Sequence, residues 1–239
     1  MNPVDWKIRE GYLKGMFPHG FPLIPGWDAA GVVQAVGEGV SDLSVGDAVY
    51  AYCRKPEVQW GTYAEYVKVT EPNVIRIPEG LSDLDAAATQ VAMATAWELV
   101  VTKGKVKQGE DVVVNAAGSG VGSAAVQIAA MAGARVIATA GSDDKLDRAR
   151  QLGASEAINY SKQSIVDEVM KMTDGRGADV VIECVGGNVL QQSLEALCLN
   201  GRLSTAGAHA GEKVEIDMIE FFRKQLTMTS THFAPVSTN

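Results

Sequence analysis

The chain has 239 residues, of which 46% are hydrophobic and 21% are charged, and its formal net charge is −8. This composition is ordinary for a globular protein with a real core and excludes disordered, collagen-like and coiled-coil chains. The acidic balance argues against a nucleic acid or an anionic membrane as the main partner, and no apolar run approaches the ~18 residues that a membrane-spanning helix needs.

The cysteines and the N-terminal residues bear on the compartment. Cys53, Cys184 and Cys198 lie far apart in the sequence and form no C-x-x-C pair, so they predict no disulfide framework. The first residues mix charges early and contain no apolar segment of the kind found in secretory signals. We therefore expect a soluble protein of a reducing compartment, the cytoplasm.

The first 80 residues predict a small β-rich unit. Short runs of β-branched and aromatic residues are separated by Gly, Pro and Asp, which is typical of short strands, here at 30–36, 47–52 and 61–69. The proline-rich stretch 17–26 predicts an irregular loop. Ser82, with an acid three residues later, predicts the start of an Ala-rich helix that runs to about Lys103.

From about residue 110 onward, buried-looking strands alternate with helices. The expected strands are 111–115, 135–139, 156–159, 179–183, 202–206 and 225–229. The expected helices are 121–132, 143–152, 162–173, 188–199 and 217–223. This alternation predicts an α/β domain, a doubly wound parallel sheet with the six strands of a dinucleotide-binding (Rossmann) fold. We expect a substrate unit over 1–82, a Rossmann unit over 83–232 and a tail over 233–239.

A glycine turn at the opening of this series carries the strongest chemical signal. The first strand leads into Ala-Ala-Gly-Ser-Gly-Val-Gly, which places Ser119 between Gly118 and Gly120 and ends at Gly122. Glycines allow close approach of the backbone, and the following helix directs free N–H groups at a pyrophosphate. A tight strand-to-helix turn without a ligand is the alternative, but the position of the turn at the start of the βα series favours a dinucleotide.

The end of the second strand bears on which dinucleotide binds. NAD sites usually carry an acid there for the ribose hydroxyls, whereas this chain has Gly141-Ser142. Ser142 can donate to a 2′-phosphate, Lys145 can supply positive charge, and Tyr160 can close over the same group. Asp143 and Asp144 would repel a phosphate unless they point away. Alternatively, both are ordinary helix-start acids and Lys145 is a surface lysine. The pattern favours NADPH over NADH.

The sequence resembles the medium-chain dehydrogenase/reductase superfamily, in its zinc-independent quinone oxidoreductase and enoyl reductase branch. The segments that carry the resemblance follow the order of the family along the chain: 2–12, 25–33, 45–49, 61–66, 94–97, 116–122, 152–154 and 158–160. The resemblance implies a GroES-like substrate domain, a Rossmann domain and an active site in the cleft between them.

The metal ligands of the zinc-dependent members are missing. Those enzymes carry a Cys near the position of Asn2 and a Gly-His-Glu where this chain has Gly-Trp-Asp, and Trp27 cannot bind a metal. The further cysteines of the family are also missing, and His19, His209 and His232 do not pair with a cysteine at ligand spacing. We expect no catalytic zinc, and we expect Cys53 to be a small buried residue.

Without a metal, the natural hydride acceptors are already polarised, as quinones and conjugated carbonyl compounds are. The resemblance places Asn2 near the nicotinamide and the substrate. It also implies that further residues contact the cofactor: Thr95 at the nicotinamide, Gly120 and Val121 on the pyrophosphate, and Val185, Gly186 and Gly207 along the strand ends. Lys7 stands where quinone reductases often have a tyrosine. Lys7 or a water is the proposed proton donor, with Asp5 orienting the loop; a surface lysine and a turn-capping acid are the ordinary alternatives.

The length of the chain differs from that of the family. Family members usually have further strands before the position of Asn2, and they return to the substrate domain after the sixth Rossmann strand. We therefore expect a truncated protein whose dinucleotide site survives better than turnover. The open alternatives are an NADP(H)-binding protein with little or no turnover and a reductase of other carbonyls. A short-chain reductase is excluded, since no Tyr is followed four residues later by Lys. The sixth strand is an apolar sheet edge, which predicts a homodimer.

Overall fold

The computed structural model describes residues 1–232, and the predicted tail 233–239 lies outside the described residues. Contacts divide the described chain into two units, residues 1–94 and residues 95–232. The boundary falls inside the helix α2 (Asp83–Trp97), whereas the sequence placed it just before that helix. Each unit is described by itself.

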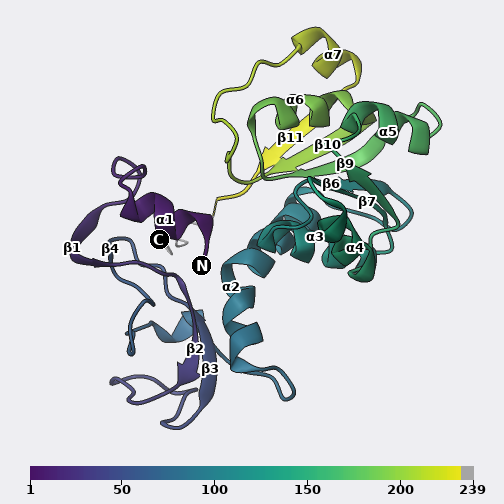
Figure 1. The fold of residues 1–239 in the computed structure, drawn as a ribbon. Coiled ribbons are helices and arrows are strands. Elements are labelled where there is room, and N and C mark those ends of the chain that lie inside the picture. The colour runs from purple at the N-terminus through teal and green to yellow at the C-terminus, as the bar shows by residue number, and fades with distance from the viewer. Residues whose placement is uncertain (233–239) are drawn as a thin grey trace. The chain divides into compact units, whose positions relative to one another are not determined.

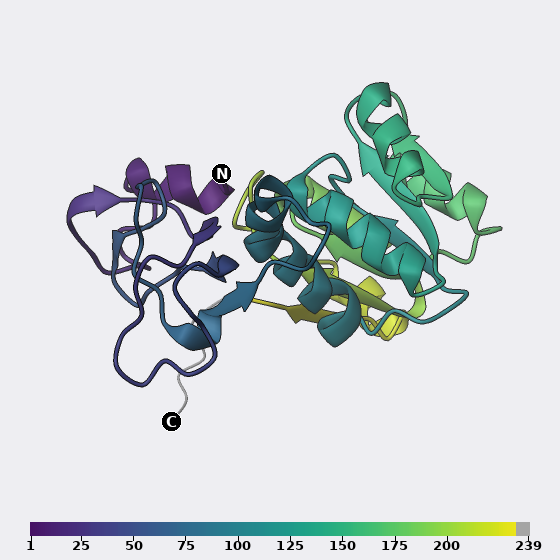
Figure 2. The same ribbon diagram turned by 90° about the horizontal axis from the view of Figure 1, so that it is seen from below.

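The first unit contains one short helix and two small sheets. Its elements are α1 (Pro3–Arg9), β1 (His19–Ile24), β2 (Asp28–Val32), β3 (Ala48–Tyr52), β4 (Val58–Trp60), η1 (Glu71–Asn73), β5 (Val74–Arg76) and the first part of α2 (Figures 1 and 2). β1 and β4 pair in parallel, while β2, β3 and β5 form an antiparallel sheet in that order.

The expectations for this unit were confirmed only in part. The strands expected near 30–36 and 47–52 are β2 and β3, although β2 begins and ends earlier. Ser82 caps α2 as predicted, accepting the Asp85 N–H at 3.1 Å. The irregular loop expected over 17–26 was wrong, because β1 forms there; it is a strand of a two-stranded sheet, where proline is tolerated.

The strand expected over 61–69 was also wrong. The start of this stretch folds back on the Pro25–Gly26 turn, with the Gly61 N–H donating to the Ile24 carbonyl at 2.8 Å. A Cβ at Gly61 would stand 2.5 Å from the Gly26 carbonyl oxygen, so the close backbone approach requires glycine. The alternation of apolar residues in this segment is typical of a strand. Its hydrogen bonds to the Pro25–Gly26 turn hold it as a loop instead.

Aromatic packing forms the core of the first unit. Trp27 is 6% exposed and packs edge-to-face on Phe17, with ring centroids 5.7 Å apart. The guanidinium of Arg54 lies 5.3 Å from the Trp27 ring centroid and 5.0 Å from that of Phe17. Trp27 is therefore a core residue held by a cation–π contact.

The second unit is built on a six-stranded parallel sheet. Its strands are β6 (Asp111–Val114), β7 (Arg135–Ala140), β8 (Glu156–Asn159), β9 (Ala178–Glu183), β10 (Leu197–Thr205) and β11 (Thr227–Ser230). The order across the sheet is β8-β7-β6-β9-β10-β11, and every neighbouring pair is parallel. Because the chain starts in the middle and winds both ways, the order reverses between β6 and β9, where Rossmann folds bind their ligands.

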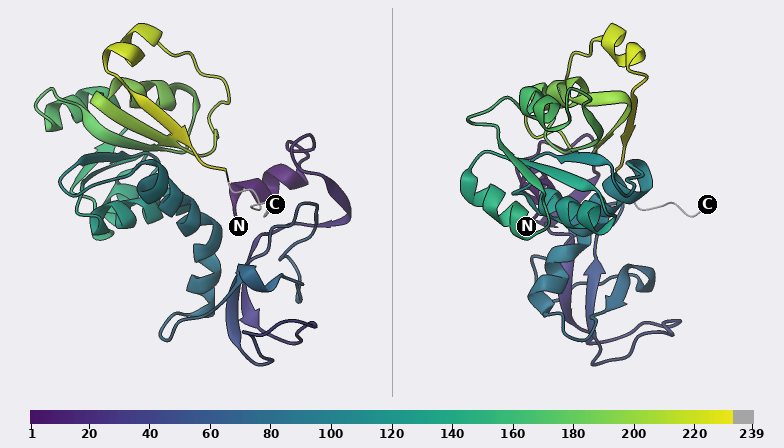
Figure 3. Two further views of the ribbon diagram at one scale, coloured as in Figure 1. Left: turned by 180° about the vertical axis from the view of Figure 1, so that it is seen from behind. Right: turned by 90° about the vertical axis from the view of Figure 1, so that its right-hand side faces the viewer.

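Helices cover both faces of this sheet. α3 (Gly120–Met131) and α4 (Asp143–Gln151) lie on one face, while α5 (Ile165–Met172) and α6 (Gly187–Glu195) lie on the other (Figure 1). α2 continues into η2 (Glu98–Lys103), and α7 (Met218–Arg223) leads into the edge strand β11 (Figure 3). No helix of the described residues is long and apolar enough to cross a membrane.

The fold class and all six predicted strands are confirmed, with one correction. The helix expected over 188–199 ends at Glu195, and the following residues begin β10 instead. Leu197 is fully buried and pairs with Ala178. Burial against the neighbouring strand therefore favours a strand over a helix at these residues. Their apolar pattern does not distinguish the end of a buried helix from the start of a buried strand.

Ion pairs hold the amino edge of the sheet, the side where the strands begin. Arg176 contacts Asp111 and Asp179 at 2.6 Å, and Arg135 reaches Asp111 and Glu156 at 3.3 Å. These pairs tie β6, β7, β8 and β9 together at one edge. The opposite edge, where the strands end, carries the loops described next.

Candidate functional site

The glycine turn follows β6 at the carboxyl edge, and a buried polar chain holds its base. The Asn115 Nδ2 donates to Ser193 Oγ at 2.8 Å, and its Oδ1 accepts from Thr139 Oγ1 at 3.0 Å. The Ala117 N–H donates to the Thr139 carbonyl at 2.9 Å. The turn is therefore fixed by the neighbouring strand β7 and by α6 before any ligand arrives.

The turn leaves two backbone donors free at the start of α3. Ser119 Oγ caps the helix by accepting the Gly122 N–H at 3.0 Å. The N–H groups of Gly120 and Val121 make no hydrogen bond with any described residue. Gly118, Ser119 and Gly120 are exposed, so these amides and the positive end of the helix are accessible to an anion. The geometry fits a pyrophosphate.

Gly122 has a different part in this turn. Its N–H is already used by Ser119, and a Cβ on it would stand 2.2 Å from the Ala116 carbonyl oxygen. Gly122 therefore lets α3 lie close to the end of β6. Its predicted contact with a cofactor remains a prediction, and it would have to be made by atoms other than the N–H.

The residues predicted for a 2′-phosphate meet at the ends of β7 and β8. The side chain of Lys145 lies over Gly118, where a Cβ would stand 2.7 Å from it. The Tyr160 ring lies over Gly141 in the same way, with its hydroxyl 2.9 Å from such a Cβ. Ser142 is the N-cap residue of α4 and makes no capping bond with its side chain. Lys145 thus lies beside the glycine turn, and Tyr160 lies beside the end of β7.

The two acids that follow Ser142 behave differently. Asp143 accepts from Asn159 Nδ2 and from Lys162 Nζ, both at 2.6 Å. The hydrogen bond from Lys162 lowers the pKa of Asp143, so its charge is balanced by a partner of its own. Asp144 is exposed and makes no hydrogen bond with the described residues. The repulsion expected from Asp143 is therefore largely offset.

The ends of β9 and β10 are organised by Glu183, which the sequence analysis did not single out. Its carboxylate accepts the N–H of Val185 at 2.6 Å and that of Gly186 at 3.1 Å, and Thr205 Oγ1 lies 3.3 Å away. The side chain is fully buried, and burial raises its pKa. An acid at the end of an otherwise apolar strand was the only available signal.

This arrangement turns the amides of Val185 and Gly186 inward. The Val185 carbonyl accepts from the Ala210 N–H at 2.7 Å, which ties the loop after β9 to the loop after β10. Gly207 is exposed in that second loop and has φ +89°. A cofactor at these residues would meet side-chain and Cα atoms, because the two amides are already used.

The predicted catalytic residues lie in the first unit. Asn2 is the N-cap residue of α1, and its Nδ2 donates to Asp28 Oδ2 at 2.7 Å. Asp5 is 3% exposed, and burial raises the pKa of both Asp5 and Asp28. Lys7 is half-buried in α1. Thr95, at the start of the second unit, is half-buried in α2. Sequence reasoning gave Asp28 no role.

Metal ligation finds little support among the described residues, where no group of three or more His, Cys, Asp and Glu side chains is placed to hold an ion. Cys53 is 3% exposed, and burial raises its pKa to about 12. The same cause raises the pKa of Cys184 to about 12. Both are therefore protonated thiols at neutral pH, which are poor ligands and poor nucleophiles.

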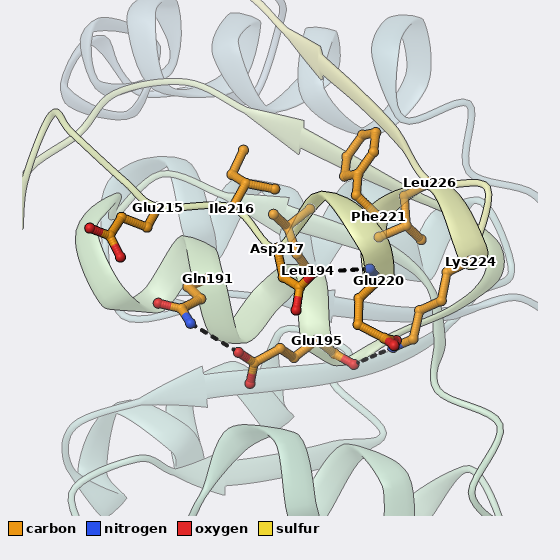
Figure 4. A pocket seen from close by; sticks show the side chains of 10 residues that line it. All are labelled: Gln191, Leu194, Glu195, Glu215, Ile216, Asp217, Glu220, Phe221, Lys224 and Leu226. Atoms are coloured by element: carbon orange, nitrogen blue, oxygen red, sulfur yellow. Dashed lines mark hydrogen bonds between the residues drawn. The ribbon is translucent and has the colours of Figure 1, made fainter.

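A separate hollow of about 100 Å³ lies between α6 and α7 (Figure 4). Lys224 Nζ donates to the Glu195 main-chain carbonyl at 2.8 Å, and Gln191 Nε2 donates to the Glu195 carboxylate at 3.2 Å. None of the predicted site residues lines it, and its floor is the apolar contact of Leu194 with Phe221 and Leu226. It is the place where α7 meets the sheet layer.

Comparison with known families matches both units. Residues 1–79 match the family described as an alcohol dehydrogenase GroES-like domain, and residues 120–238 match the family described as a zinc-binding dehydrogenase. The chain is 36% identical to a quinone oxidoreductase of Sus scrofa over 208 residues, which are 87% of this chain and 61% of that protein. It is 35% identical to a 2-haloacrylate reductase of a Burkholderia species over 224 residues, 91% of this chain and 66% of that protein.

Solved structures agree with these matches. A crystal structure of an NAD-dependent alcohol dehydrogenase superposes with a TM-score of 0.89 at 39% identity, covering 96% of this chain and 73% of that one. The Escherichia coli quinone oxidoreductase complexed with NADPH superposes with a TM-score of 0.85 at 28% identity, covering 97% and 69%. The chain thus spans about three fifths to three quarters of the length of these four proteins.

An added methyl group should have different effects at the two glycines of the turn, Gly118 and Gly122. Gly122→Ala places a Cβ against backbone that cannot move cheaply, and we expect it to lower the free energy of unfolding by about 1–3 kcal/mol despite the better helix propensity of alanine. In Gly118→Ala the added Cβ meets side-chain atoms of Lys145 and no backbone, so we expect a smaller loss, below ~1 kcal/mol. Urea denaturation followed by circular dichroism measures both; equal losses would contradict the assignment of Gly122 to packing.

Glu183 predicts a pH-dependent stability. Its pKa is higher in the folded chain than the ordinary value of 4.5, so its ionised form is disfavoured by folding. The contribution of the protonated group is complete below pH 4.5 and is lost as the pH rises through the folded pKa. We expect Glu183→Gln to gain stability relative to the unmodified chain as the pH rises above 4.5 and up to the folded pKa of Glu183.

Denaturation curves at a series of pH values give this difference, and subtraction of the unmodified chain cancels the other buried acids. The exposed Glu195→Gln is the matched control and should follow the unmodified chain. A stability difference for Glu183→Gln that does not change with pH would show that Glu183 titrates as it does in the unfolded chain.

Proposed function

Because this chain belongs to the medium-chain dehydrogenase/reductase superfamily, in its quinone oxidoreductase branch, we propose that it is an NADPH-dependent reductase. The proposed reaction transfers a hydride to a quinone or to an α,β-unsaturated carbonyl compound without a catalytic zinc. The observation that carries the proposal is the pair of free amides on Gly120 and Val121, exposed at the start of α3 and at the switch point of the sheet.

The preference for NADPH over NADH rests on the charges at the ends of β7 and β8. Lys145 and Ser142 offer a cation and a hydroxyl beside Gly118 and Gly141, and Lys162 balances the acid at 143. The strand tip itself carries Gly141 and Ser142 where NAD sites carry an acid for the ribose 2′-hydroxyl, and Asp144 lies beyond it in the first turn of α4. NADH is the competing cofactor, which the similarity to an NAD-dependent alcohol dehydrogenase favours.

The proposed roles follow from what each residue can offer. NADPH, when bound, supplies the hydride. Gly120 and Val121 hold its pyrophosphate, and Val185, Gly186, Gly207 and Thr95 line it. Asn2 contacts the acceptor. Lys7 or a water provides the proton that completes the reduction.

A zinc is not part of the proposal. Trp27 stands where the zinc-dependent relatives carry a histidine ligand, and its ring is enclosed by Phe17 and Arg54. The acceptor must therefore be polarised by its own conjugation, as quinones and enals are. The names of the pig quinone oxidoreductase and the bacterial 2-haloacrylate reductase fit this substrate class.

The runner-up function is dinucleotide binding with little or no turnover. The observation that favours it is that the predicted cofactor residues all lie in the second unit, which has a sheet and a core of its own. Asn2, the predicted contact with the acceptor, lies in the first unit instead. Binding of the cofactor therefore does not require turnover. Reduction of other carbonyls is a further alternative.

We place the protein in the cytoplasm, because its three cysteines are free.

Titration with both cofactors tests the proposal. We expect the nucleotide fluorescence to report tighter binding of NADPH than of NADH, and the near-ultraviolet absorbance of NADPH to fall when a quinone or an enal is added. Binding without consumption would favour the runner-up function. Tighter binding of NADH would contradict the role of Ser142 and Lys145.

Lys145→Ala is the matched variant for this test. Loss of a charge-assisted contact to the 2′-phosphate should weaken NADPH binding about tenfold, or ~1.4 kcal/mol, and leave NADH binding unchanged. Lys107→Ala, an exposed lysine at the other edge of the sheet, should change neither affinity.

We also propose a homodimer through the edge strand β11, which has one side without a partner strand in the described sheet and an exposed Met228. Sedimentation should give a dimer for the unmodified chain and a larger monomer fraction for Met228→Lys. Met131→Lys, at an exposed helix end, is the control. A monomer at all concentrations would exclude this interface.

A further inference from the structure

Asn2 lies between two acids of the first unit and donates a hydrogen bond to each. Its main-chain N–H donates to Asp5 Oδ2 at 2.7 Å, and its side-chain Nδ2 donates to Asp28 Oδ2 at 2.7 Å. Asp5 is almost completely buried and Asp28 is half-buried. The backbone and the side chain of Asn2 are therefore held separately, by groups from α1 and from β2.

The contact with Asp28 decides which end of the Asn2 carboxamide faces which way. An ionised carboxylate accepts hydrogen bonds and donates none, so only the amide nitrogen fits beside it at this distance. The oxygen end then faces the first turn of α1, where Asn2 and Asp5 form a capping box and the Asp5 N–H donates to the Asn2 main-chain carbonyl at 3.0 Å. One polar group of the carboxamide is left, the second N–H of Nδ2.

Asp28 is itself fixed from the opposite side. Its Oδ1 accepts the main-chain N–H of Val91 in α2 at 3.0 Å, so its two oxygens serve two different partners. Because both oxygens are used, the carboxylate cannot rotate without losing a hydrogen bond. A carboxylate with this arrangement orients its neighbours rather than exchanging protons with a ligand.

We propose that Asp28 is a positioning residue, which aims the remaining N–H of Asn2 at the carbonyl oxygen of the hydride acceptor. This inference rests on the proposed reductase function. It adds a role for the first unit of the chain, which would supply a fixed hydrogen-bond donor to the acceptor. A donor held in place before the reaction stabilises negative charge that develops on the acceptor oxygen. The cofactor site, built from residues of the second unit, does not involve Asp28.

A mutant cycle tests the proposal by steady-state kinetics. Asp28→Ala should lower kcat for a quinone or an enal by about 10- to 100-fold, since a misplaced donor costs that much, with the Kd for NADPH changed by less than about twofold. Asn2→Ala should lower kcat to a similar extent. In the Asn2→Ala background, Asp28→Ala should cost nothing more, because Asp28 acts through Asn2.

A merely structural role gives different results. If Asp28 only stabilises the unit, its replacement lowers kcat by the same factor with and without Asn2, and the proposal fails. Asp28→Asn keeps the shape and loses one acceptor, and it takes the place of Asp28→Ala in the cycle if the alanine variant does not fold. Glu79→Gln, an exposed acid of the same unit, is the control and should match the unmodified chain.

An amide spectrum separates failure of this inference from failure of the proposed function. With ¹⁵N-labelled asparagine, the Asn2 side-chain signal is identified by its loss in Asn2→Ala. In the unmodified chain one of its protons should be shifted downfield by the carboxylate and lose that shift in Asp28→Ala. If the proton shift is the same in the unmodified chain and in Asp28→Ala, the inference is overturned even when the protein is active. If the shift is present and the unmodified chain is inactive, the result counts against the proposed function alone.

Discussion

The predicted cofactor site of the second unit depends on the free N–H groups of Gly120 and Val121. They are unpaired because a helix cannot satisfy its own first amides, and they stay exposed because the residues around them are small. Ser119 pairs the third amide, Gly122 brings α3 against β6, and Asn115 anchors the turn to Thr139 and Ser193. Each residue of the turn thus either provides a donor or keeps the donors in place.

Buried carboxylates play a common part in both units. Glu183 in the second unit and Asp5 and Asp28 in the first accept hydrogen bonds from N–H or hydroxyl groups, and no lysine or arginine forms an ion pair with them among the described residues. Burial raises the pKa of all three. Their benefit to the chain is geometric, since each fixes a loop or a helix start that carries predicted site residues. Acids with cation partners, such as Asp111 and Asp179, lie at the opposite edge of the sheet.

The second unit could be predicted from the sequence because its strands are apolar on both faces and its turns carry glycine. β8 was predicted at its observed bounds, and α4 to within a residue.

The first unit could not be predicted to the same extent, because its strands are short and its order comes from long-range contacts. The alternation over 61–69 suggested a strand, but Gly61 packs against the backbone of Pro25 and Gly26 instead. α1 carried a capping signal in Asn2, Pro3 and Asp5 that was not used. The roles of Glu183 and Asp28 depend on which N–H groups they meet, and a sequence does not show that.

The position of Trp27 links the packing of the first unit to its chemistry. An indole cannot accept a metal, but its face attracts a cation, and here the guanidinium of Arg54 occupies that face while Phe17 packs on the edge. The Arg54 guanidinium is buried in the core of the unit, where it packs on both rings. Under the proposed function, hydrogen-bond donors such as the Asn2 amide take the place of a metal at the acceptor oxygen, and they stabilise an oxygen anion less than a metal does. Such donors are best matched to an acceptor that spreads the incoming charge over its own conjugated system, and the proposed quinone and enal substrates are of this kind.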